Sequence, residues 1–97
     1  MKYEFHPAAE AEHLENVGYY ELKRAGLGAT YLSDFETTMN KICGFPSRFP
    51  VERKPDISRG KMEKFPFTIL FRESSGMIQI LAVAHLRRRP LYWLGRL

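Results

Sequence analysis

Apolar residues recur at helical spacing through the first half of the chain. The small and apolar residues that repeat every three or four positions are Ala11, Leu14, Gly18, Leu22 and Ala25, with Val17 beside them. This period predicts a helix from Pro7 to about Ala25 with these residues on its buried face. His13 stands among glutamates and is expected on the polar face. The alternating segment Lys2–Phe5 predicts a short strand before the helix, with His6 at the corner.

A second helical period follows a glycine-rich break. Gly26-Leu27-Gly28 interrupts the first helix. The apolar residues beyond it, spaced at intervals of three, four and three, are Leu32, Phe35, Met39 and Ile42. Gly44 and Pro46 mark the end of this second helix. Because the connecting loop is so short, the two helices are expected to lie antiparallel, as a hairpin.

The second half of the chain changes to the period of strands. Apolar and polar side chains alternate in Phe67–Arg72, and Met77–His85 is almost continuously apolar, as in a strand in the interior of a sheet. Ser74-Ser75-Gly76 predicts a tight turn between them, and therefore a hairpin. The segment 49–60 holds two prolines and three basic residues, which favour a loop or a short edge strand.

The expected fold is therefore α+β. It has an N-terminal strand, an antiparallel helix hairpin, then a three-stranded antiparallel sheet with both helices on one face and a short C-terminal helix or turn. The length of 97 residues predicts one domain, residues 1–97. No apolar run is long enough for a signal peptide or a membrane span, so we expect a cytoplasmic protein without a membrane partner. The single cysteine, Cys43, is expected to be a small core residue.

The net charge of +4 is unevenly distributed along the chain. Seven of the eleven acidic residues precede Phe45, whereas eleven of the fifteen basic residues follow Gly44. A surface polarised in this way attracts an anionic partner. The charge alone leaves two kinds of partner open, a nucleic acid or an acidic protein segment.

The closing segment VAHLRRRPLYWLGRL, residues 83–97, holds the densest group of candidate functional side chains. His85 directly follows the apolar strand, and Arg87, Arg88 and Arg89 come next. In an extended chain Arg87 and Arg89 would share one side and Arg88 would oppose them. The planar guanidinium group of arginine suits phosphates and carboxylates alike. Three arginines beside a histidine and two aromatic residues predict a binding role.

Each of these residues also has a structural interpretation. A histidine without a paired acid is more often structural, and His85 is expected to bond a backbone carbonyl or to pack under Tyr92. Trp93 is expected to fold back over apolar sheet surface, which leaves Tyr92 as the better candidate for contact with a partner. The arginine run has the alternative role of keeping a sheet edge from pairing with another chain. Because no ligand spacing and no phosphate-binding glycine loop are present, we expect neither a metal site nor a cofactor.

Three pieces of the sequence together resemble the RelE/ParE toxins of type II toxin–antitoxin systems, which include plasmid stabilisation proteins. The first piece is FHP at residues 5–7, followed by an acid-rich helix. The second is the GLG turn with a helix that ends before Phe45-Pro46. The third is FPF at 65–67 with the ending AVAHLRRRPLYW at 82–93. Phe67 departs from the family pattern, where tyrosine is common. The resemblance spans essentially the whole chain.

The resemblance implies a growth-inhibiting toxin that a cognate antitoxin neutralises by occupying its groove. Members of the family differ in their targets: RelE-like toxins cleave messenger RNA on the ribosome, and ParE-like toxins poison DNA gyrase without being nucleases. The GLG-helix-FP pattern and the RRxPxYW ending favour the ParE-like activity. A RelE-like endonuclease is the alternative, and a degenerate toxin that only binds its antitoxin is a further one. Whether the chain is an enzyme therefore stays open.

Two overlapping sets of candidate residues follow. Metal-independent RNA cleavage needs an acid, a base and cations at the phosphate. The residues that would serve a nuclease are His85, Tyr92, Arg59, Arg72 and Arg87. The residues expected to bind an antitoxin or a target are Arg87, Arg88, Arg89, Tyr92, Lys64 and Arg59.

Overall fold

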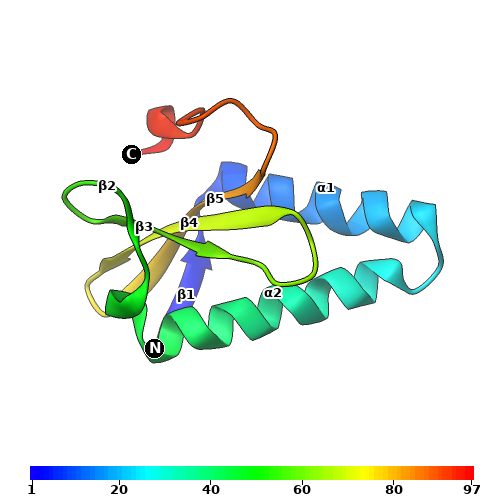
Figure 1. The fold of residues 1–97 in the computed structure, drawn as a ribbon, viewed down its shortest axis with the longest axis horizontal. Coiled ribbons are helices and arrows are strands. Elements are labelled where there is room, and N and C mark those ends of the chain that lie inside the picture. The colour runs from blue at the N-terminus through cyan, green and yellow to red at the C-terminus, as the bar shows by residue number, and fades with distance from the viewer.

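Two helices cover one face of a five-stranded mixed sheet in the computed structural model, which describes residues 1–97 (Figure 1). The elements in chain order are β1 (Lys2–Phe5), α1 (Pro7–Lys23), α2 (Leu27–Gly44), a 3₁₀ turn η1 (Pro46–Arg48), β2 (Val51–Arg53), β3 (Ile57–Lys61), β4 (Phe67–Ser74), β5 (Met77–His85) and a second 3₁₀ turn η2 (Leu94–Arg96). The α+β class, the helix hairpin, the β4–β5 hairpin and the short C-terminal turn are as predicted from the sequence. Neither helix combines the length and apolarity needed to cross a membrane.

The sheet is larger than predicted. Its strand order is β1-β5-β4-β3-β2, with β1 parallel to β5 and all other neighbours antiparallel. The prediction of a three-stranded antiparallel sheet is therefore wrong in detail. The segment 49–60, expected to be a loop or a short edge strand, holds the short edge strand β2 and also most of β3. β1 joins the sheet by pairing Lys2–Phe5 with Met77–Ile80. A pairing between segments so far apart in the chain leaves no local pattern in the sequence.

The face of α1 that packs on the core is not the one predicted. Leu14 and Leu22 are 63% and 91% exposed, whereas Ala9 and His13 are buried. The prediction that His13 lies on the polar face is wrong, because its imidazole ring makes contacts inside the protein. Its ring packs at a tilt against Phe35, with centroids 4.2 Å apart, and its Nδ1 lies 3.1 Å from the hydroxyl of Tyr31.

A buried polar network explains how His13 is accommodated. The side-chain amide of Asn16 donates a hydrogen bond of 3.1 Å to the Tyr31 hydroxyl oxygen. The single proton of that hydroxyl is then free to be donated to Nδ1 of His13. Burial lowers the pKa of His13, against the opposing charges of Glu36 and Glu10, so the neutral imidazole is favoured.

The second helix packs on the sheet and also fixes a loop. Phe35, Met39 and Ile42 are buried as predicted, together with Tyr31, while Leu32 is 37% exposed. The carboxylate of Asp34, which is 4% exposed, accepts hydrogen bonds from three successive backbone N–H groups. The donors are Glu63, Lys64 and Phe65, at 3.3, 2.8 and 3.0 Å. The connection between β3 and β4 is therefore held against α2.

The opposite face of the sheet is covered by the C-terminal tail, residues 86–97. Figure 1 shows this tail, orange to red, returning from the end of β5. Trp93 is 2% exposed and belongs to a second apolar cluster with Ile57, Leu70, Leu81 and Ala82. The expectation that Trp93 folds back over apolar sheet surface is confirmed. The sheet is thus sandwiched between a helical layer and the tail.

Candidate functional site

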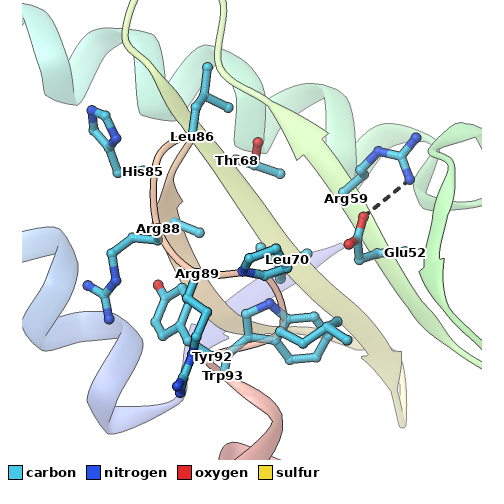
Figure 2. Close-up of a pocket in the computed structure, with 13 residues that line it drawn as sticks. Glu52, Arg59, Thr68, Leu70, His85, Leu86, Arg88, Arg89, Tyr92 and Trp93 are labelled. Atoms are coloured by element: carbon cyan, nitrogen blue, oxygen red, sulfur yellow. Dashed lines mark hydrogen bonds and ion pairs between the residues drawn. The ribbon is translucent and has the colours of Figure 1, made fainter.

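A groove of about 220 Å³ lies between the tail and the sheet face that it covers (Figure 2). Its lining residues come from three places: Glu52 and Arg59 from β2 and β3, Thr68 and Leu70 from β4, and Ala84–Leu86 with Arg88–Trp93 from the end of β5 and the tail. We call it the arginine groove. It is the largest gathering of the side chains that the sequence singled out.

The strand register builds the floor of the arginine groove. Arg59 on β3 lies opposite Leu70 on β4, and Thr68 on β4 lies opposite Ala84 on β5. Opposed residues of neighbouring strands point to the same face of a sheet, so all four side chains face the tail. The tail then closes one side of the groove with Arg88, Arg89 and the aromatic pair.

The groove is electropositive. Three of its lining residues are arginines, and its only acidic residue is Glu52. Glu52 pairs with Arg59 at 3.3 Å, while Arg88 and Arg89 form no ion pair within the chain. The Arg88 guanidinium instead lies 3.9 Å from the centroid of the Tyr92 ring. Two unneutralised guanidinium groups beside an aromatic ring are suited to binding carboxylate or phosphate groups.

Tyr92 is held in place by its hydroxyl. The hydroxyl donates a hydrogen bond of 2.6 Å to Oε2 of Glu12, on α1. Burial and this bond to a carboxylate both raise the pKa of Tyr92 above its usual value. The hydroxyl is therefore a poor proton donor to any ligand in the groove. What Tyr92 presents to a ligand is the face of its ring.

Glu12 fixes this wall of the groove, a role that sequence reasoning missed because the residue shows only as one of several acids early in a helix. Its carboxylate accepts hydrogen bonds from the backbone N–H of Val83 at 3.1 Å and from both Nη atoms of Arg96 at 2.9 Å. Burial opposes ionisation of Glu12, but the hydrogen bonds from Arg96, Tyr92 and Val83 outweigh it and lower its pKa. The hydrogen-bond partners of Glu12 lie 71 to 84 residues away in the sequence, so no local pattern predicts these contacts.

His85 stands where the groove meets α1. Its Nδ1 accepts a 3.0 Å hydrogen bond from the backbone N–H of Arg87, and its ring packs edge-on against Phe67, with centroids 5.3 Å apart. These partners replace the backbone carbonyl and the Tyr92 ring that we expected. With Nδ1 accepting, the neutral imidazole carries its proton on Nε2. A protonated Nδ1 would lose this hydrogen bond.

The other predicted site residues lie outside the groove. Arg72 donates from Nε to Oε1 of Gln79 at 2.9 Å, near the β4–β5 turn. Lys64 sits in the loop held by Asp34. Arg87 is exposed but does not line the groove, because the chain turns at 86–88 instead of staying extended. The structure thus brings together Arg59, His85, Arg88, Arg89 and Tyr92, and it separates Arg72, Lys64 and Arg87 from them.

The chemistry available in the groove is the binding of anions. No cluster of three or more His, Cys, Asp or Glu side chains that could hold a metal ion occurs in the chain. In comparisons with known proteins, no family model and no curated protein matches the sequence. The arginine groove is therefore interpreted from its own residues.

Proposed function

We propose that this chain is the toxin of a type II toxin–antitoxin pair, and that it acts by binding a target, DNA gyrase, instead of cleaving RNA. The observation that carries the proposal is the arginine groove. It presents Arg88 and Arg89 without acidic partners beside the ring of Tyr92. An acidic segment of a cognate antitoxin fits this chemistry, because its carboxylates would pair with the guanidinium groups.

The arrangement of elements supports the same proposal. A first strand, a helix hairpin and then consecutive antiparallel strands follow in the order that the resemblance to RelE/ParE toxins implies. The segment that most resembles the family, AVAHLRRRPLYW, supplies one side of the groove. The segment that carries the sequence resemblance therefore also forms one side of the groove.

The preference for a non-nuclease toxin rests on the state of the candidate acid and base. The Tyr92 hydroxyl already donates a hydrogen bond to Glu12, and its pKa is raised. Arg72, a candidate phosphate ligand, bonds Gln79 outside the groove. RNA cleavage needs an acid and a base on either side of the phosphate, with their protons available. Of the proposed catalytic set, His85, Arg59 and Tyr92 line the groove, and the Tyr92 hydroxyl is already bonded to Glu12.

One observation favours the alternative of a ribosome-dependent endonuclease. His85 borders the same groove as three arginines, although its ring packs on Phe67, the residue opposite it on β4, and an imidazole near phosphate-binding cations can assist RNA cleavage. Primer extension on translated messenger RNA after induction tests it. Cuts in codon register that disappear in His85→Ala would support the nuclease and contradict the gyrase proposal.

Growth and gyrase assays test the main proposal. Induction of the wild-type chain alone should arrest growth, and co-expression of the small protein encoded beside it should restore growth. Purified chain should inhibit DNA supercoiling by gyrase. An absence of both growth arrest and supercoiling inhibition would contradict a toxin that acts on gyrase. If the chain still bound the neighbouring protein, it would be a degenerate toxin.

Paired variants tie the activity to the groove. Arg88→Ala with Arg89→Ala should weaken the complex with the neighbouring protein by about tenfold or more in calorimetry, because the carboxylates of the partner would lose both guanidinium groups. Arg53→Ala with Lys54→Ala is the matched control, because both residues are exposed and neither lines the groove. Equal affinities for the two double variants would place the contact elsewhere.

A further inference from the structure

The solvent-facing side of α1 carries an apolar stripe, defined by Ala11, Leu14, Gly18 and Leu22. All four are exposed, and Leu22 reaches 91% exposure. The core-facing side of the same helix is supplied by Ala9 and His13. The stripe therefore adds nothing to the packing of one copy of the chain. Large apolar side chains aligned on one exposed helix face mark a surface that contacts another protein.

Gly18 at the middle of the stripe has no role within one copy of the chain. Glycine in the interior of a helix is destabilising relative to alanine. A Cβ atom at Gly18 would meet no other atom within 4 Å, so the fold does not require the small residue. Glycine does allow another backbone to approach closely. The position thus fits a point where a second helix crosses α1.

The stripe is symmetric about Gly18, since Leu14 precedes it by four residues and Leu22 follows it by four. A two-fold axis through Gly18 relates two antiparallel copies of α1. It places Leu14 of each copy against Leu22 of the other and the two Gly18 residues face to face. Such an interface is isologous, with the same surface used on both sides.

The charges along α1 also favour an antiparallel second copy. Glu10 and Glu15 lie toward the start of the helix, and Lys23 and Arg24 lie at its end. None of the four forms an ion pair within the chain. With the axis at Gly18, Arg24 of one copy comes within about two residues, or about 3 Å along the helix, of the level of Glu10 in the other. Parallel copies would place Glu10 level with Glu10 and Arg24 level with Arg24. The antiparallel register does bring Glu15 level with Glu21, so the complementarity rests on Glu10 and Arg24.

We propose that the apolar stripe of α1 is a homodimer interface, in which two copies pair antiparallel about Gly18. The contact is one helix against one helix, so it is smaller than a standard interface of about 1,600 Å² and the dimer is weak. We expect a dissociation constant on the order of 10–100 μM. The arginine groove takes no part, so this pairing does not depend on the proposed function.

Sedimentation equilibrium of the purified chain, from about 5 μM to about 1 mM, tests the pairing. The average mass should rise with concentration from that of one chain toward that of two. Leu22→Glu should keep the chain monomeric, whereas Val51→Glu, an exposed site on β2, should leave the dimer unchanged. A single monomeric mass for the wild type at all concentrations would overturn the proposal, and the stripe would then be a contact surface for a different protein. A wild-type dimer unaffected by Leu22→Glu would overturn it as well.

Gly18→Leu and an exchange of the charges at Glu10 and Arg24 test the position of the axis. Gly18→Leu should weaken the dimer at least tenfold because it separates the two helices, while thermal melting should show a chain at least as stable as the wild type. Glu10→Lys and Arg24→Glu should each weaken the dimer, and the two together should restore it, because the charges are exchanged across the axis. If the double variant stays as weak as either single one, the antiparallel register is wrong.

Discussion

Both Nη atoms of Arg96 donate to the carboxylate of Glu12, each at 2.9 Å, although the two residues are 84 positions apart. Nη1 of Arg96 also donates to the backbone oxygen of Leu81 at 3.0 Å. The contact therefore ties the end of the tail to α1 and to β5. The groove has a defined shape because this contact holds the tail on the sheet.

Replacement of Arg96 by alanine should loosen the tail. The side chains of Arg96 and Glu12 are only 17% and 12% exposed, so the variant leaves a largely buried carboxylate with fewer donors. We expect a loss of about 2–3 kcal/mol in the free energy of unfolding, measured by urea titration. The only tryptophan, Trp93, should show red-shifted fluorescence before global unfolding as it becomes hydrated.

Lys41→Ala is the control for this variant. Lys41 pairs with Glu63 at 3.1 Å, but the two side chains are 57% and 55% exposed. Exposed ion pairs contribute little, so a change within about 0.5 kcal/mol is expected. Equal effects of Arg96→Ala and Lys41→Ala would show that the tail is not held by the Glu12 contact.

Stability should fall as the pH drops below about 6.5, because of His13. Burial lowers the pKa of His13 in the folded state from the ordinary value of 6.5. Below 6.5 the unfolded chain therefore binds a proton that the folded chain resists, and the stabilisation present at neutral pH is lost. Urea titrations at pH 7.5 and 5.5 measure the difference. In His13→Gln this difference should shrink, and an unchanged difference would assign the pH dependence to other groups.

Removal of the Asp34 carboxylate should destabilise the chain through the β3–β4 connection. Asp34→Ala leaves three backbone N–H groups, those of residues 63–65, without their acceptor. A loss of about 2–4 kcal/mol in the free energy of unfolding is expected, and Asp34→Asn should lose less because an amide oxygen still accepts. Ser33→Ala, at an exposed neighbouring site, should change it by about 0.5 kcal/mol or less. Hydrogen exchange should report faster opening at Lys64 and Phe65 in Asp34→Ala.

Two glycines should respond in opposite ways to alanine. At Gly60 a Cβ would lie 2.9 Å from Cδ1 of Ile42 and 3.3 Å from Cε2 of Phe49, so Gly60→Ala should destabilise by about 1 kcal/mol or more. At Gly18 nothing is in the way, and Gly18→Ala should stabilise one copy of the chain by about 0.5–1 kcal/mol. Thermal melts at low concentration compare the two. A stabilising Gly60→Ala would contradict the close packing of β3 on α2.

Local patterns predicted the elements that carry a strong period. The α2 stripe through Phe35, Met39 and Ile42 and the nearly continuous apolar run of β5 both appear where expected, because each must face a core whatever its partner. The apolar period of α1 predicted the wrong buried face, because its most regular apolar residues, Leu14 and Leu22, face solvent. A helix with apolar residues on two sides does not reveal which side packs inside.

The sequence predicted which types of residue form the candidate site, but not which individual residues belong to it. The arginine run pointed to a binding surface, and two of its three arginines line the groove. Arg59 joins them because strand register sets it opposite Leu70, and Arg72 is excluded by its bond to Gln79. Glu12 belongs to the wall only because the tail returns to α1.

Local patterns along the chain specify the helices, the hairpin strands, the charge polarity and most of the apolar residues that must be buried. These depend on neighbours a few positions away. Three features arise only in the folded chain: the parallel pairing of β1 with β5, the burial of His13, and the contacts of Glu12 with Tyr92 and Arg96. Each of these joins groups that are distant in the chain, and their energies appear only once the intervening segments have folded.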